Sequence, residues 1–93
     1  MRTIRQTGQF RRDLKREAKG RHLEVLSREF TQIVALIAKD QPLSERLRDH
    51  ELSGQWRDCR DCHIRPDLVL IYRKPDNDTL ELVRLGSHSE LGI

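Results

Sequence analysis

The chain has 93 residues, 35% of them hydrophobic and 35% charged, which suffices for one modest core, so we expect a single domain over residues 1–93. No apolar run approaches the ~20 residues of a membrane-spanning helix, and the first residues lead into polar sequence rather than into the apolar segment of a signal peptide. This composition argues against a membrane-spanning protein, and we expect a cytoplasmic location with no membrane partner.

The net charge of +3 is unevenly distributed. Residues 1–28 contain nine Lys or Arg and three acidic residues, whereas residues 29–93 contain nine basic and twelve acidic residues. Such a basic segment either contacts the phosphates of a nucleic acid or forms the solvated side of a helix. Its candidate RNA-binding residues are Arg11, Arg12, Lys15, Arg16 and Lys19.

The N-terminal half predicts one strand followed by two helices. Residues 3–7 are rich in β-branched side chains and predict the strand. Apolar residues at every fourth position predict a helix over 9–19, which Gly20 ends. A continuous apolar stripe predicts a second helix over 22–39, and the short connection predicts an antiparallel helical hairpin.

The C-terminal half predicts a β-meander after an irregular segment. Residues 43–55 show no periodicity, apart from a possible helical turn at 44–47. Alternation and turn residues then predict strands over 57–65, 67–73 and 79–85, a corner at Pro66, a turn at 74–78 and a tail over 86–93. We therefore expect an α+β fold, in which an N-terminal strand and a two-helix hairpin pack on one face of a mainly antiparallel four-stranded sheet. The other face is expected to be open.

Proton-transfer groups gather on the strand predicted over 57–65. Because side chains alternate along a strand, Asp61, His63 and Arg65 share one face, the open one. Histidine exchanges protons near neutral pH, and a neighbouring carboxylate fixes its tautomer. Asp67 follows the Pro66 corner at the start of the next strand.

The other histidines lie outside the predicted strands. His50 and His88 fall in loop and tail segments that are free to converge on the open face. His22, at the start of the second helix, is expected to be a solvated surface residue.

The two cysteines form a pattern with His63 that invites a cofactor interpretation. Cys59-Arg60-Asp61-Cys62-His63 matches the Cys-x-x-Cys-His pattern of covalent haem attachment. That chemistry belongs to exported proteins, and the only methionine available as an axial ligand is Met1. Positions three apart on a strand face opposite ways, which also opposes a redox pair or a zinc site. We expect two free thiols, with Cys62 semi-buried on the inner face, and no cofactor.

Four separated segments together resemble the YafQ branch of the RelE superfamily of bacterial toxins, which belong to type II toxin–antitoxin systems. The segments are Asp49-His50 followed by Leu52-Ser53-Gly54-Gln55-Trp56, then Arg60-Asp61-x-His63, then Pro66-Asp67 before an apolar strand, and Arg84 followed by Gly86-Ser87-His88. The opening from Gly8 to Lys15 also fits the first helix of that family. The resemblance covers nearly the whole chain.

The resemblance implies a RelE-like microbial ribonuclease fold and a metal-free endoribonuclease that cleaves translated mRNA in the ribosomal A site. The implied partners are a cognate antitoxin, the ribosome with its 30S A site and ribosomal RNA, and mRNA. The catalytic residues implied are His50, Asp61, His63, Asp67 and His88. His88 would be the general acid, and Asp67 and His63 are candidates for the base or for the group that orients it. His50 is a second candidate acid or phosphate contact, and Arg65 or Arg84 would offset phosphate charge. Relatives carry an aromatic residue four positions after the final histidine, where this chain has Gly92.

Two other interpretations remain open. One is a catalytically impaired module that keeps the toxin fold and only binds RNA or a partner, which the missing tail aromatic would suit. The other is a metal-dependent hydrolase that uses His50, His63, His88 and Asp67, and that would lose activity in excess chelator.

Overall fold

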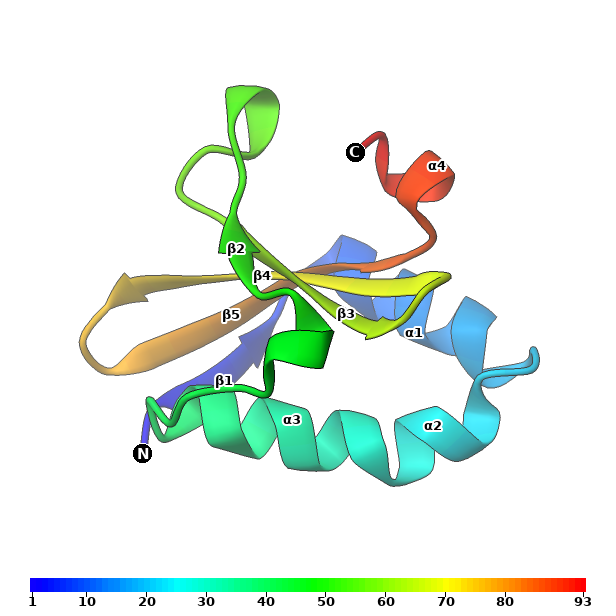
Figure 1. The fold of residues 1–93 in the computed structure, drawn as a ribbon, viewed down its shortest axis with the longest axis horizontal. Coiled ribbons are helices and arrows are strands. Elements are labelled where there is room, and N and C mark those ends of the chain that lie inside the picture. Colours follow the sequence, from blue (N-terminus) through cyan, green and yellow to red (C-terminus); the bar gives the residue numbers. More distant parts are fainter.

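The computed structural model describes residues 1–93 and shows an α+β fold around a mixed five-stranded sheet (Figure 1). The strand order is β1-β5-β4-β3-β2, with β1 parallel to β5 and the other neighbouring pairs antiparallel. The strands are β1 (Thr3–Gln6), β2 (His50–Glu51), β3 (Arg60–Arg65), β4 (Leu68–Asp76) and β5 (Thr79–Gly86). The helices are α1 (Gly8–Ala18), α2 (Leu23–Ser27), α3 (Glu29–Ala38) and α4 (His88–Leu91), with 3₁₀ turns η1 (Glu45–Leu47) and η2 (Gly54–Trp56). None of the helices is long and apolar enough to cross a membrane.

The α+β class is confirmed. The prediction of four strands is wrong, because the sheet has five. The segment expected to be irregular contributes β2, a two-residue edge strand that pairs with β3. The hairpin turn between β4 and β5 is also tighter than predicted, because β4 continues to Asp76 and only Asn77 and Asp78 form the turn.

The helices begin and end at recognisable signals. The side chain of Thr7 caps α1 by accepting a hydrogen bond from the Phe10 backbone N–H at 2.9 Å. The single helix predicted over 22–39 is two helices, because Arg28 leaves the helical region with φ −123° and ψ −81°. Figure 1 shows α2 and α3 along one side of the sheet, with α4 and the β2–β3 loop on the other.

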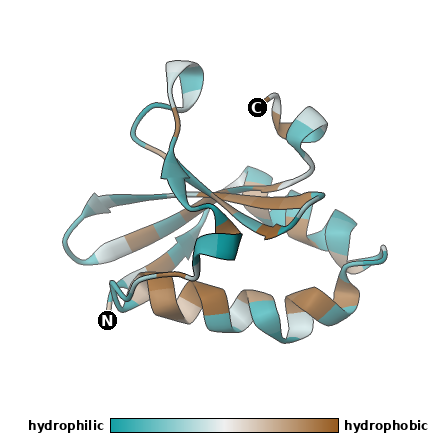
Figure 2. Ribbon diagram, in the orientation of Figure 1, coloured by the Kyte–Doolittle hydropathy of each residue, from teal (hydrophilic) through white to brown (hydrophobic).

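The main core lies between the helices and the sheet. The aromatic rings of Phe10 in α1 and Phe30 in α3 stack with centroids 6.2 Å apart. They pack with inward-facing side chains of β3, β4 and β5, among them Cys62, Leu70 and Leu82. In Figure 2 the hydrophobic bands of α2 and α3 alternate with hydrophilic ones, as expected for helices with one buried face.

The opposite face of the sheet is partly covered rather than open. Cys59, Val69, Ile71 and Leu91 form a second, smaller apolar cluster there. Partly buried side chains of the β2–β3 loop, of β5 and of the tail pack against it, namely Leu52, Trp56, Val83 and Ile93. The loop and the tail therefore bring their own residues onto this face, which is where the candidate site lies.

Candidate active site

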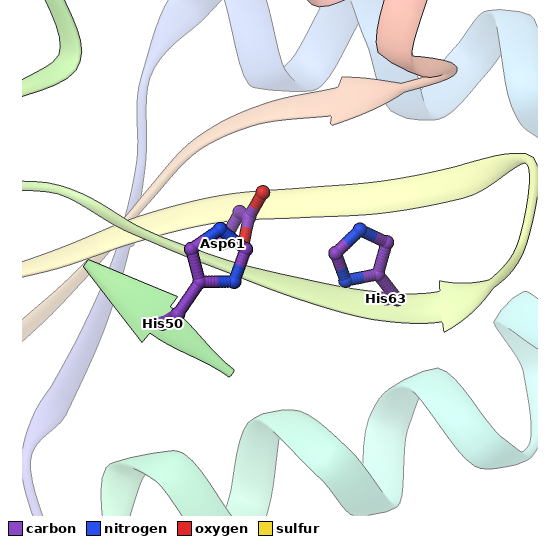
Figure 3. Close-up of side chains that lie close together, drawn as sticks. All are labelled: His50, Asp61 and His63. Atoms are coloured by element: carbon purple, nitrogen blue, oxygen red, sulfur yellow. The ribbon is translucent and has the colours of Figure 1, made fainter. Parts of the chain in front are cut away.

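Three imidazole rings stack in a row on the sheet face opposite α1 to α3. His50 on β2 pairs directly with Asp61 on β3, and His63 lies two residues further along β3 on the same face (Figure 3). His88 is the first residue of α4, immediately after β5. The ring centroids of His50 and His63 are 5.9 Å apart, and those of His63 and His88 are 4.9 Å apart. The structure thus brings together four of the five residues that the sequence suggested as catalytic.

Asp61 is a buried carboxyl group with few partners. It is 2% exposed, and its Oδ1 lies 2.8 Å from His50 Nδ1, although in a direction that makes no well-formed hydrogen bond. Burial raises the pKa of Asp61, and the neighbouring imidazoles of His50, His63 and His88 oppose that rise only in part. Ionisation of Asp61 therefore lowers the free energy of unfolding of the protein.

His50 is oriented by two oxygen atoms. Its Nδ1 lies 2.7 Å from the backbone carbonyl oxygen of Arg48 as well as 2.8 Å from Asp61 Oδ1. Two acceptors at this nitrogen favour the tautomer with the hydrogen on Nδ1, which leaves the lone pair on Nε2 free to accept a proton. The preceding residue, Asp49, is held by the Tyr72 hydroxyl at 2.5 Å and by Arg60 Nε at 3.2 Å.

His63 and His88 touch each other directly. Their Nε2 atoms are 3.0 Å apart, so one nitrogen carries a hydrogen and the other presents its lone pair. His63 Nδ1 is buried without a hydrogen-bond partner. A buried lone pair without a partner is tolerated better than a buried N–H without one, which favours His63 Nε2–H as the donor and His88 Nε2 as the acceptor.

The tail that carries His88 is fixed by a capping box and by an arginine from α1. The Ser87 hydroxyl accepts from the Glu90 N–H at 3.2 Å, and Glu90 Oε1 accepts from the Ser87 N–H at 2.8 Å. Arg16 Nη2 donates to the Leu85 carbonyl at 2.8 Å, and Arg16 Nε lies 3.4 Å from Glu90. A Cβ atom on Gly86 would lie 2.8 Å from Arg16 Nη2, so a side chain there would displace the end of the Arg16 side chain.

A second buried carboxylate, Asp13, holds the end of β5 from the helical side. It is 0% exposed and accepts hydrogen bonds from Arg84 Nε at 2.7 Å and from the Leu85 N–H at 3.0 Å. Burial alone would raise the pKa of Asp13, but these hydrogen bonds and one from Gln9 outweigh it and hold that pKa below its ordinary value. The guanidinium of Arg84, which the sequence suggested for RNA binding, is therefore engaged inside the protein.

Asp67 lies away from the imidazole row. Its carboxylate forms an ion pair with Arg21 and lies 3.5 Å from His22 Nε2, both in the connection between α1 and α2. The expectation that His22 is a solvated surface residue is wrong, because its side chain is buried between Asp67 and Glu17. The structure does not bring Asp67 together with the other candidate catalytic residues.

The basic residues suggested for RNA binding divide into free and engaged groups. Five side chains of α1 and its end are exposed: Arg11, Arg12, Lys15, Arg16 and Lys19. Of these, Arg16 is engaged within the protein, with Leu85 and Glu90. Arg65 instead donates two hydrogen bonds of 2.6 Å to Glu29 on α3. A shift in the β3–β4 register between His63 and Arg65 interrupts the alternation that placed Arg65 beside His63.

Sequence reasoning missed two arginines that face His63 and His88. Arg46 in η1 and Arg48 just after it line a cavity of about 420 Å³ together with both histidines and Arg65. They lie in the segment without periodicity, so no pattern indicated the direction of their side chains. Only the charge of the two residues could have suggested them.

The prediction of two free thiols is confirmed, but Cys62 is fully buried rather than semi-buried. Both thiols are free, with Cys62 in the main core and Cys59 in the cluster on the opposite face. Burial raises the pKa of Cys62 to about 12, so it stays protonated and unreactive at neutral pH.

Two imidazoles of the row and the neighbouring Asp61 carboxylate also have the spacing of a metal site. Ligand atoms of His50, Asp61 and His63 all lie within 4.8 Å of one another. Two imidazoles and a carboxylate are suitable ligands for zinc or copper. The same donors can therefore serve proton transfer or metal binding.

Gly92, where the family resemblance led us to expect an aromatic residue, has a structural role. Gly92 adopts the left-handed conformation, with φ 71° and ψ 34°, and ends α4. Its backbone N–H donates a hydrogen bond to the carbonyl oxygen of His88. A side chain would be strained in this conformation.

Comparisons with known proteins agree with this fold. The family model described as "Bacterial toxin of type II toxin-antitoxin system, YafQ" matches residues 2–92. The mRNA interferase toxin YafQ of Escherichia coli strain K12 is 36% identical over 90 residues, which cover 97% of this chain and 95% of that protein.

Solved structures resemble the whole chain as well. A metal-bound toxin from Helicobacter pylori has a TM-score of 0.83 and 45% identity, covering 98% of this chain and 99% of that one. YafQ in the Escherichia coli DinJ–YafQ toxin–antitoxin complex has a TM-score of 0.77 and 35% identity, covering 97% and 96%. The chain therefore belongs to the YafQ family of toxins of type II toxin–antitoxin systems.

Proposed function

We propose that the protein is an endoribonuclease that cleaves translated mRNA in the ribosomal A site by imidazole acid–base chemistry without a metal. The observation that carries the proposal is the row formed by His50, His63 and His88 beside the buried Asp61. The name of the Escherichia coli relative, an mRNA interferase toxin, supports the same reaction class. A single YafQ-like domain over residues 1–93 would suffice for it.

The reaction is attack of a ribose 2′-oxygen on the adjacent phosphorus. The 2′-oxygen–phosphorus bond forms as the phosphorus–5′-oxygen bond breaks, giving a cyclic phosphate and a free 5′-hydroxyl. A base takes the 2′-hydroxyl proton and an acid supplies a proton to the leaving oxygen, and each such group typically contributes about 10²–10⁴-fold in rate.

The row of rings separates the base from the acid. In-line displacement puts the attacking and leaving oxygens on opposite sides of phosphorus, so two rings in contact, such as His63 and His88, cannot serve both. His50 and His88 lie at the two ends of the row. We assign His50, with its free Nε2, as the base. We assign His88 as the acid, a role in which it acts as the imidazolium after taking up a proton at the nitrogen that otherwise accepts from His63. His63 lies between them and hydrogen-bonds to His88, while Asp61 orients His50.

The exposed basic side chains of α1 are suited to ribosomal RNA. Arg11, Arg12, Lys15 and Lys19 are exposed and belong to the basic N-terminal segment. Phosphate contacts of this kind release counterions, so affinity falls as salt rises. Ribosome binding that is unchanged between low and high salt would contradict this assignment.

The proposed regulator is a cognate antitoxin protein. A YafQ relative occurs in a toxin–antitoxin complex at 35% identity and nearly full coverage. Co-expression with the antitoxin of the same operon should remove the toxicity of the chain.

The experiment is to induce the wild type and His88→Ala in cells and to map the 5′ ends of the mRNA. We expect ends in phase with the reading frame in the wild type, together with growth arrest, and neither in the variant. Ends that ignore the reading frame would overturn ribosome dependence, and equal cleavage by the variant would overturn the acid assignment. Growth without cleavage in both strains would favour the impaired binding module.

A metal-dependent hydrolase is the second candidate, favoured by the 4.8 Å cluster of His50, Asp61 and His63. The metal-bound Helicobacter pylori toxin shows that a relative of this fold takes up metal. Cleavage that stops in excess chelator and returns with added zinc would establish this alternative.

A further inference from the structure

The cavity of about 420 Å³ beside the imidazole row is strongly basic. Its walls include the guanidinium-bearing residues Arg46, Arg48 and Arg65 and the rings of His63 and His88. No carboxylate lines it. A cavity with this lining attracts an anion, because closely spaced positive charges without counter-charges repel one another.

The three arginines differ in how their charge is balanced. Arg65 is satisfied by two hydrogen bonds of 2.6 Å from its terminal nitrogens to Glu29. Arg46 and Arg48 form no ion pair within 4.0 Å, and their side chains make no hydrogen bond within the protein. Their donors are therefore free for an external ligand. Arginine presents paired donors that fit two oxygens of one phosphate.

The backbone brings this charge next to the reacting groups. Arg48 adopts the left-handed conformation, with φ 49° and ψ 43°, and its own carbonyl accepts from His50 Nδ1. The residue whose carbonyl orients the proposed base thus also lines the cavity shared by the proposed acid and His63. A left-handed non-glycine residue costs free energy, and such strain is concentrated at functional sites.

We propose that this cavity holds the scissile phosphodiester of the RNA, with Arg46 and Arg48 bound to its non-bridging oxygens. The inference rests on the proposed nuclease function and adds the groups that neutralise the charge developing on phosphorus. It also explains why His63 and His88 line the same cavity: the phosphate lies against both rings. His50 does not line the cavity, so the ribose with the attacking 2′-hydroxyl extends past His63 towards the His50 ring stacked on it. Arg65 contributes by neutralising Glu29, the carboxylate that pairs with it beside the cavity.

The first test measures binding without cleavage. The probe is a trinucleotide RNA with a 2′-O-methyl group on each ribose, titrated while the ring signals of His63 and His88 are followed by NMR. The variant is Arg46→Gln with Arg48→Gln. The control is Arg5→Gln with Lys39→Gln, which removes the same charge from exposed residues on β1 and after α3.

We expect saturable ring shifts in the wild type and the control, and affinity about 10- to 100-fold weaker in the Arg46 and Arg48 variant. Equal affinity of the variant and the control would overturn the inference. Thermal unfolding of each variant confirms that it is folded, and single substitutions at Arg46 and at Arg48 replace the double one if it is not.

The second test separates substrate phosphate from ribosomal RNA. At saturating ribosomes, loss of charge stabilisation should lower kcat about 100-fold in the Arg46 and Arg48 variant. A rise in KM for ribosomes with kcat unchanged would show that the two arginines bind ribosomal RNA and would overturn the inference. A wild type that binds the probe through Arg46 and Arg48 but never cleaves RNA would refute the nuclease function while supporting the phosphate site.

Discussion

Two buried aspartates on opposite faces of the sheet show opposite electrostatic behaviour. Asp13, on the helical face, is 0% exposed and accepts hydrogen bonds from Arg84, Leu85 and Gln9. Asp61, on the other face, is 2% exposed and has only the imidazole of His50 within ion-pair distance. Burial is therefore not what distinguishes them.

The hydrogen bonds decide the difference. Burial favours the neutral form of both groups, yet the pKa of Asp13 is lowered and that of Asp61 is raised. Asp13 stabilises the fold as an anion, whereas the ionised Asp61 destabilises it. A protein keeps such a destabilising group where function needs it, which supports assigning chemistry to the face of Asp61 and structure to the face of Asp13.

The largest expected effect is on activity, at the exposed end of the imidazole row. Replacement of His50 by Ala should lower the cleavage rate about 10²–10⁴-fold, because the proposed base is lost. The free energy of unfolding should change little, since the His50 side chain is 53% exposed. Glu51→Ala, the exposed neighbour on β2, is the matched control and should keep its activity. Equal activity of the two variants would remove His50 from the mechanism.

The next effect is on stability, on the face of Asp13. Asp13→Ala should lower the free energy of unfolding by about 3–5 kcal/mol, because Arg84 and the Leu85 N–H lose their buried acceptor. Urea denaturation measures this loss. The exposed Asp78→Ala should stay within about 0.5 kcal/mol of the wild type. A decrease in unfolding free energy below about 1 kcal/mol for Asp13→Ala would contradict the structural role assigned to Asp13.

The two carboxyl groups should also respond oppositely to pH. The pKa of Asp13 is lowered in the folded state, so its contribution is present above the unfolded pKa and is lost as pH falls through the folded pKa. The destabilisation caused by Asp13→Asn should therefore shrink in acid, below pH ~4.

The pKa of Asp61 is raised in the folded state, so its contribution is present below the unfolded pKa and is lost as pH rises through the folded pKa. The advantage of Asp61→Asn over the wild type should therefore grow as pH rises from ~4 towards neutral. Parallel pH curves of unfolding free energy for the two Asn variants would contradict the opposite pKa shifts.

The smallest effect is the stability change at Asp61 itself. Asp61→Asn should raise the free energy of unfolding at neutral pH by about 0.5–2 kcal/mol, because a poorly solvated charge is removed at nearly constant volume. The same variant should cleave more slowly, since His50 loses its orienting carboxylate. Urea denaturation beside Asp78→Asn tests the first part. If Asp61→Asn instead lowers the free energy of unfolding, Asp61 stabilises the fold as Asp13 does, and the contrast between the two is contradicted.

The parts of the site that local periodicity controls could be predicted from the sequence. Alternation along β3 is a local property, and it correctly placed Asp61 and His63 on one face and Cys62 on the other. The same rule failed for Arg65, because a register shift after His63 interrupts the alternation. No feature of the sequence indicated that shift.

The parts that depend on tertiary contacts could not be predicted. β2 has only two residues, which are too few to show a periodic pattern. The pairing of His50 with Asp61 could therefore not be predicted from the sequence. Asp67 was assigned to the site from its place after the Pro66 corner and from the family resemblance, but its ion pair with Arg21 depends on where the α1–α2 connection passes. The helical turn expected at 44–47 is present as η1, but a single turn shows no period, so the direction of the Arg46 side chain could not be predicted.

The most direct measurement of the central claim is single-turnover cleavage of a defined mRNA on purified ribosomes, with the wild type and His88→Ala, each treated with excess chelator that is removed before the ribosomes are added in Mg²⁺ buffer. We expect the wild type to cut within the A-site codon at a rate that chelator does not change, and His88→Ala to be at least about 100-fold slower. The exposed Ser89→Ala, on the same helix, should match the wild type. Full activity of His88→Ala, or complete inhibition of the wild type by chelator, would contradict acid–base catalysis by the imidazole row.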